Sequence, residues 1–85
     1  MGKAIVAARI EKIRQGLDTN EKALGHGIWE SKVDHGPGYR IYFGREGRTV
    51  VILLMGGSKH RQDRDIKRAK VFWQDYLRRQ NGKTF

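Results

Sequence analysis

The chain opens with a helical pattern of hydrophobic and polar positions. Its apolar residues recur at intervals of three and four, at Val6, Ile10, Ile13 and Leu17. This spacing lines them along one face of a helix and predicts a helix over residues 3–17. Gly16 and the polar cluster 18–20 should end it. Residues 20–27 are mostly polar and are predicted to form a loop.

Three segments with strand character follow. Residues 28–34 alternate loosely. Residues 39–43 alternate clearly, which predicts one face with Tyr39, Ile41 and Phe43 and another with Arg40 and Tyr42. Residues 49–55 are apolar on both faces, a pattern typical of a covered strand at the centre of a sheet. The glycine- and proline-rich segment 35–38 and the segment 44–47 predict tight turns between these strands.

A second helix is predicted from residue 60 or 61 to residue 79. One face carries Ile66, Ala69, Trp73 and Leu77, with Phe72 and Tyr76 beside them. Ser58 is a candidate N-cap for this helix, and the tail 81–85 should be loose.

These elements predict a single α+β domain spanning residues 1–85. The order is helix, three strands joined by tight turns, and helix, so the strands should form a small antiparallel meander. The N-terminal helix should cover one face of the sheet, and the C-terminal helix should pack on the sheet or beside it. A chain of 85 residues leaves no room for a second domain.

Charge narrows the choice of partners. Lys and Arg total 18 against nine Asp and Glu, for a net charge of +9. Such a field attracts nucleic acid, the ribosome, an acidic protein or an anionic membrane surface. The alternative interpretation is a generally soluble basic surface. The absence of cysteine excludes disulfides, thiolate zinc sites and a Cys nucleophile. No apolar run is long enough for a membrane helix and no secretory signal is evident, so a cytoplasmic location is expected.

Several basic residues should meet at one edge of the predicted sheet. In a meander, the end of the first strand, the start of the second and the end of the third share an edge. Lys32, Arg40, Lys59 and Arg61 should therefore converge there, with Arg64 one turn further along the last helix. Converging cations suit a phosphodiester, whose negative charge they would hold and stabilise. A structural ion pair of Arg40 with Asp34 or Asp65 is the alternative for that residue.

Aromatic and imidazole side chains lie near the same edge. Trp29, Tyr42 and Tyr39 offer rings on which bases could stack, although Tyr39 alternates with core residues and Trp29 could equally be core. His60 and His35 are candidate general acids or bases, with an exposed loop histidine as the alternative reading for both. The histidines lack the spacing of metal ligands, so neither a metal nor another cofactor is expected.

Four segments together resemble the RelE/ParE superfamily of toxins, and most closely its HigB-like addiction module killer group. These segments are residues 36–43 (GPGYRIYF), 50–54, 56–59 (GGSK) and 62–69 (QDRDIKRA). The resemblance extends over about residues 3–76. It implies the toxin of a type II toxin–antitoxin pair, with a cognate antitoxin as its protein partner.

The resemblance also implies a chemistry. RelE-like toxins cut mRNA on the ribosome without a metal, because basic side chains orient the RNA so that a 2′-hydroxyl attacks the adjacent phosphate. By motif position, Arg40 matches the strand arginine of these enzymes and Lys32 a lysine of the preceding strand. Lys59 or Arg61 matches the basic residue after the last strand. The alternatives are a ParE-like inhibitor of DNA gyrase and an inactive remnant that binds RNA or antitoxin.

Two departures from the family pattern carry expectations of their own. The family's first strand and a further helix have no counterpart before the helix at 3–17. The expected explanations are a truncated or misannotated start, or a reduced form whose unpaired sheet edge is covered by dimerisation or by a partner. The family's proton-transfer group has no clear match either. Asp65 falls near its position, Tyr76 lies too far along the helix, and His60 is a substitute.

Overall fold

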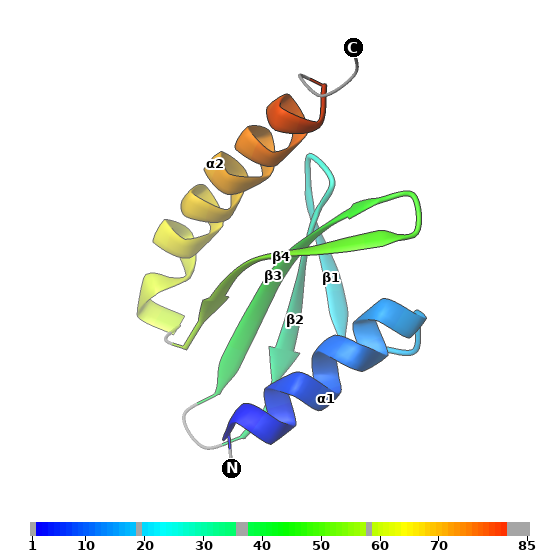
Figure 1. The fold of residues 1–85 in the computed structure, drawn as a ribbon. Helices are drawn as coiled ribbons and strands as arrows, with labels where there is room; N and C mark the ends of the chain where they lie inside the picture. Colours follow the sequence, from blue (N-terminus) through cyan, green and yellow to red (C-terminus); the bar gives the residue numbers. More distant parts are fainter. Residues whose placement is uncertain (1, 19, 36–37, 58, 82–85) are drawn as a thin grey trace.

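The computed structural model describes residues 2–18, 20–35, 38–57 and 59–81. The elements are α1 (Gly2–Gln15), β1 (Glu21–Gly25), β2 (Ile28–Val33), β3 (Tyr39–Glu46), β4 (Thr49–Gly56), the short 3₁₀ helix η1 (Lys59–Arg61) and α2 (Gln62–Asn81). The four strands form one antiparallel sheet in the order β1-β2-β3-β4. Helices α1 and α2 cover opposite faces of it (Figure 1). The predicted α+β class, with one helix at each end of the chain, is confirmed.

The apolar stripe of α1 packs on one face of the sheet. Ile13 is buried there with Val33, Ile41 and Phe43, and the earlier stripe residues join them. The alternation predicted for residues 39–43 is therefore observed. Leu17 departs from the prediction and is 63% exposed, because the helix ends at Gln15 and the chain turns away at Gly16, which has a positive φ of 74°.

Trp73 organises the other face, under α2. Its ring packs among Ile28, Tyr42 and Ala69 and stacks on Tyr76 at a centroid distance of 5.4 Å. The indole nitrogen donates a hydrogen bond to the carbonyl of His26 at 3.0 Å, which fastens the C-terminal half of α2 to the β1–β2 turn.

The first correction concerns residues 20–27, which form a strand and a turn instead of a loop. Strand β1 lies at the edge of the sheet beyond β2 and is mostly exposed, so it has little hydrophobic pattern. Pairing with β2 decides its conformation. A tertiary contact also holds it, because Arg45 reaches Glu21 from β3 at 2.7 Å. The sheet consequently has four strands where the sequence predicted three.

The second correction concerns the turn predicted at 44–47. Strand β3 continues to Glu46, and the turn lies at Gly47 and Arg48. Gly44 stays in the strand because it lies directly under the Trp73 ring, where a β-carbon would collide with the indole. This glycine serves helix packing and not the turn.

The third correction concerns β4, whose pattern predicted a central strand covered on both faces. Within the described part of the chain β4 is an edge strand that pairs with β3 alone. Helix α2 covers one of its faces, but Ile52 and Met55 on the other face are 37% and 58% exposed. The apolar composition of a strand indicates how strongly it favours burial, but it does not indicate which strands pair with it.

Three further expectations fall outside the described residues: the Gly-Pro step of the 35–38 turn, the Ser58 cap and the tail beyond Asn81. No helix among the described residues is both long enough and apolar enough to cross a membrane.

The Trp73–Gly44 contact generates a stability prediction. Replacing Gly44 by Ala should destabilise the fold by about 1–3 kcal/mol, since the new methyl group overpacks a rigid ring against backbone. The matched control is Gly57→Ala, whose β-carbon would meet only the Gly38 carbonyl oxygen at 3.9 Å. Urea unfolding followed by Trp fluorescence measures both variants. Equal stability of the two would contradict the packing role of Gly44.

Candidate functional site

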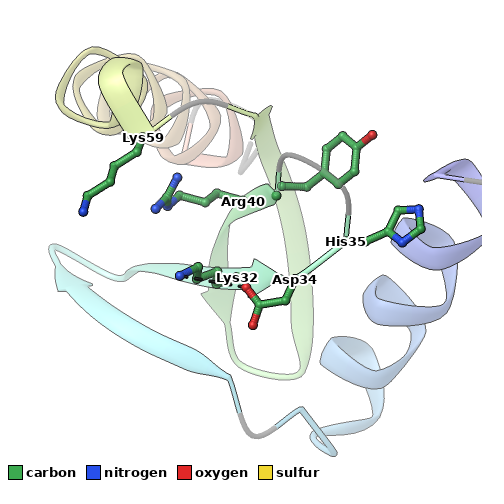
Figure 2. A pocket seen from close by; sticks show the side chains of 7 residues that line it. Lys32, Asp34, His35, Arg40 and Lys59 are labelled. Carbon is green, nitrogen blue, oxygen red and sulfur yellow. Dashed lines mark ion pairs between the residues drawn. The ribbon is translucent and has the colours of Figure 1, made fainter.

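A polar pocket of about 430 Å³ opens at one end of the sheet (Figure 2). It lies where β2 ends, β3 begins and η1 follows β4. Its lining residues are Lys32, Asp34, His35, Gly38, Tyr39, Arg40 and Lys59. The antiparallel order of the strands brings these three chain segments to the same end, as the sequence predicted.

Three cations line this pocket. Lys32 and Arg40 are cross-strand neighbours in the β2–β3 register and therefore point to the same face of the sheet. Lys59 reaches toward them from η1, and Figure 2 shows the three side chains extending in the same direction. Both lysines are exposed. The nearest counter-charge of Lys32 is Asp34 at 3.9 Å, a solvated pair that contributes little and leaves the ammonium available to a ligand.

Arg40 is held from behind by a buried carboxylate. Its Nε lies 3.1 Å from Oε1 of Glu30, and the Gln62 amide donates to the same oxygen at 3.0 Å. Glu30 is only 6% exposed, and the Arg40 side chain is 13% exposed. The guanidinium is thus anchored through Nε while it still lines the pocket.

The partner of Arg40 differs from the one expected from the sequence. Asp34 and Asp65 were the candidates, and Glu30 is the residue found. The register explains this, because Glu30 lies on β2 two residues before Lys32, the direct neighbour of Arg40, and so projects from the same face. A diagonal contact in an antiparallel pair is within reach of long side chains. Strand alternation in the sequence was the signal that could have identified Glu30.

Tyr42 and Asp65 lie deeper on the same face. Tyr42 is fully buried, and its hydroxyl has no hydrogen-bond partner among the described residues. The Asp65 carboxylate packs against Gly56, which lacks the side chain that would collide with it. Burial, and then the negative charges of Glu30 and Asp65, raise the pKa of Tyr42 to about 12. Tyr42 is therefore a neutral, internal group, and its predicted role as a surface on which bases stack is incompatible with this placement.

The remaining predicted site residues divide into two groups. His35 lines the pocket, although Figure 2 shows its ring directed away from the three cations. His60, Arg61 and Arg64 are exposed on η1 and the start of α2 but do not line the pocket.

Trp29 belongs to neither group. It lies on the α1 face of the sheet, with the Arg45 guanidinium 5.1 Å from its ring centre, and is not part of this site.

The arrangement suits recognition of a phosphate within a polymer. An anchored guanidinium offers directional donors, and two exposed ammonium groups supply charge around it. Tyr39, half-buried between the pocket and the α1 core, contributes an aromatic edge to the wall. The described residues contain no cluster of three or more His, Asp or Glu side chains suited to a metal ion.

Comparison with known proteins found a relative of this chain. It is 42% identical over 73 residues to an uncharacterized protein of Haemophilus influenzae (strain Rd), an alignment that covers 86% of this chain and 74% of the relative. No family model matches the chain, and no solved structure matches it.

The Glu30–Arg40 pair generates a coupling prediction. Arg40→Ala should destabilise the protein by about 2–4 kcal/mol, because it leaves the Glu30 carboxylate buried without its counter-charge. Adding Glu30→Gln should recover most of that loss, since the buried negative charge is then removed. Urea denaturation of the two single variants and the double variant measures the coupling. Additive effects would show that the two side chains do not depend on each other.

Tyr42 generates a prediction for alkaline pH. A tyrosine whose pKa is higher in the folded state stabilises the fold fully below the unfolded value of 10.0, and the contribution is lost as the pH rises through about 12. The loss should be roughly 2–3 kcal/mol. Tyr42→Phe should remove this dependence, because the group that titrates is then absent. Unfolding curves from pH 8 to pH 12 compare the two proteins. An identical fall in both would contradict the assignment.

Proposed function

We propose a function from the resemblance of the sequence to RelE-like toxins together with the pocket, since the chain belongs to the same family as the Haemophilus influenzae protein, whose name states no activity. The protein is the toxin of a type II toxin–antitoxin pair. It acts in the cytoplasm as a metal-independent endonuclease that cuts mRNA on the ribosome and so inhibits translation.

The observation that carries this proposal is the convergence of Lys32, Arg40 and Lys59 on one pocket. By motif position, Arg40, Lys32 and either Lys59 or Arg61 match the basic residues of the RNA-cutting RelE-like toxins that the sequence resembles. The buried Glu30 beneath Arg40 supports the proposal further, because it holds the guanidinium in a fixed orientation before any ligand arrives. A charged group that is already held in place stabilises the charge of the transition state without first having to be reoriented.

The chemistry requires little else from the protein. The 2′-oxygen of one ribose attacks the adjacent phosphorus while the bond from phosphorus to the 5′-oxygen of the next nucleotide breaks. The products are a 2′,3′-cyclic phosphate and a free 5′-hydroxyl, and the proton lost by the 2′-hydroxyl is balanced by the one gained at the leaving oxygen. Negative charge grows on the phosphate oxygens in between, where the three cations stabilise it.

The proposal leaves proton transfer to His35 or His60, although the His35 ring is directed away from the three cations and His60 does not line the pocket. His35 lies in the lining, and His60 follows Lys59 directly on η1. Imidazole can both accept and donate a proton near neutral pH. Tyr42 is unsuited to this role, because it is buried and its pKa of about 12 keeps it protonated.

The charge of the chain supports the proposed partners. A net charge of +9 favours the polyanionic ribosome, and it equally favours an acidic antitoxin segment laid over the same pocket. Both ligands would then compete for Lys32 and Lys59.

The test replaces the two exposed lysines of the pocket. Lys32→Ala with Lys59→Ala should reduce mRNA cleavage and growth arrest by about tenfold or more, because transition-state charge loses two of its three counter-charges. The matched control is Lys12→Ala with Lys67→Ala, two exposed lysines on α1 and α2 outside the pocket that remove the same total charge. Induced cells are assayed for growth and for 5′-hydroxyl ends on transcripts.

The outcomes of this test distinguish the proposed nuclease from the alternative functions. Intact transcripts with altered DNA supercoiling would replace the proposal by gyrase inhibition. Normal growth with a folded wild-type protein would indicate a binding remnant. Equal loss of activity in both double variants would show that the overall positive charge of the chain, and not the pocket, accounts for the activity.

A further inference from the structure

Gln62, the first residue of α2, donates a hydrogen bond to the carboxylate that lies behind the pocket. Its Nε2 is 3.0 Å from Oε1 of Glu30, and the same oxygen receives Nε of Arg40 at 3.1 Å. Glu30 is only 6% exposed, so water competes little for that oxygen. A single buried acceptor thus joins the start of α2 to the guanidinium of the pocket.

Lys59 lies in the short segment between this hydrogen bond and the sheet. Gly56 ends β4 and is the cross-strand neighbour of Arg40. The chain leaves the sheet beside Arg40, forms η1 with Lys59 as its first residue, and returns at Gln62 to the partner of Arg40. Both ends of the segment are therefore attached at the Glu30–Arg40 pair.

The side chain of Lys59 has no attachment of this kind. It is exposed, and no ion pair among the described residues holds its ammonium group. The direction in which it extends is consequently set by the backbone of η1. Figure 2 shows it extending in the same direction as Arg40 and Lys32.

We propose that Gln62 is a positioning residue of the basic pocket, and that it fixes Lys59 relative to Arg40. An amide suits this role because it donates a hydrogen bond without adding charge. A cation at this position would compete with Arg40 for Glu30, and a second carboxylate would repel Glu30. The role of Gln62 rests on the proposed function, because an RNA phosphate is the ligand that Lys59 and Arg40 hold together.

Fixing Lys59 in advance matters because two cations that hold one phosphate need a set separation. Without the hydrogen bond from Gln62, η1 must be ordered when the ligand binds, and this cost lowers both affinity and rate. The contribution of Gln62 should therefore be visible only while Lys59 is present. A residue that merely stabilises the fold would contribute equally with or without Lys59.

The first experiment combines Gln62→Met with Lys59→Ala and measures cleavage of mRNA on ribosomes. Methionine has about the size of glutamine but lacks its N–H donors. Gln62→Met should lower the rate at saturating ribosome by about tenfold in the wild-type chain. In the Lys59→Ala background the same substitution should lower it by less than about twofold, since the group that Gln62 positions is then absent.

The matched control is Gln15→Met. Gln15 also donates its amide to a glutamate carboxylate at 3.0 Å, that of Glu11, but this pair is exposed on α1 outside the pocket. The control should leave cleavage unchanged. Urea unfolding of each variant confirms that the protein assayed is folded.

An exchange of partners keeps the role testable if Gln62→Met does not fold. Gln62→Glu places two carboxylates together and should lower the cleavage rate by about tenfold or more. Adding Glu30→Gln restores one amide and one carboxylate with their positions exchanged. The double variant should recover most of the lost rate, because the hydrogen bond between β2 and α2 is rebuilt.

The second experiment measures binding without cleavage. The probe is a fluorescein-labelled RNA oligonucleotide whose 2′-oxygens are methylated, so that it cannot be cut. Fluorescence anisotropy at low salt gives its Kd for the proteins of the first experiment. Lys59→Ala should weaken binding by about fivefold in the wild-type chain and by less than about twofold when Gln62→Met is also present.

The outcomes distinguish a failure of this role from a failure of the nuclease. Equal losses from Gln62→Met with and without Lys59 would overturn the positioning role, and so would a control that loses as much activity or a partner exchange that recovers none. A wild-type chain that binds the probe but cuts no mRNA would refute the nuclease, whereas coupling of Gln62 to Lys59 in binding would still support the role. A chain that neither binds nor cuts would overturn both.

Discussion

The buried contact between Glu30 and Arg40 is the constraint on which the rest of this molecule depends. A carboxylate that is 6% exposed must be compensated, and Arg40 and Gln62 compensate it from β3 and α2. The sheet and the C-terminal helix therefore meet at one charged group. The guanidinium that neutralises Glu30 on one side faces the basic pocket on the other, so one ion pair both joins the elements and orients the site.

This arrangement explains how a small, strongly basic chain can hold cations close together. Repulsion among Lys32, Arg40 and Lys59 is reduced because Arg40 is partly neutralised from below and both lysines remain in water. In the proposed function, an incoming phosphate completes the charge balance. The proposed nuclease activity uses the excess positive charge of the pocket, because the transition state develops the negative charge that balances it.

Cationic and apolar side chains gather on different parts of the surface. Cations gather at the end of the sheet formed by β2, β3 and η1, whereas apolar side chains gather along the outer edge of β4.

Local pattern was sufficient for much of the fold and part of the site. The stripe of α1, the alternation of β3 and the apolar face of α2 follow from residue periodicity, because each is decided within a few turns or pleats. The convergence of Lys32, Arg40 and Lys59 also followed, since tight turns dictate an antiparallel meander and hence a shared edge, whereas Arg61, predicted to join them, does not line the pocket.

Tertiary contacts decided the rest. Strand β1 has almost no pattern of its own and exists because β2 pairs with it. Gly44 looks like a turn residue but lies under Trp73, and β4 reads as central although no described strand pairs with its outer edge. The burial of Tyr42 depends on how α2 packs on the sheet, and the choice of Glu30 as partner for Arg40 depends on the register between β2 and β3. Periodicity encodes which face of an element avoids water, whereas its neighbours are selected only when the whole chain packs.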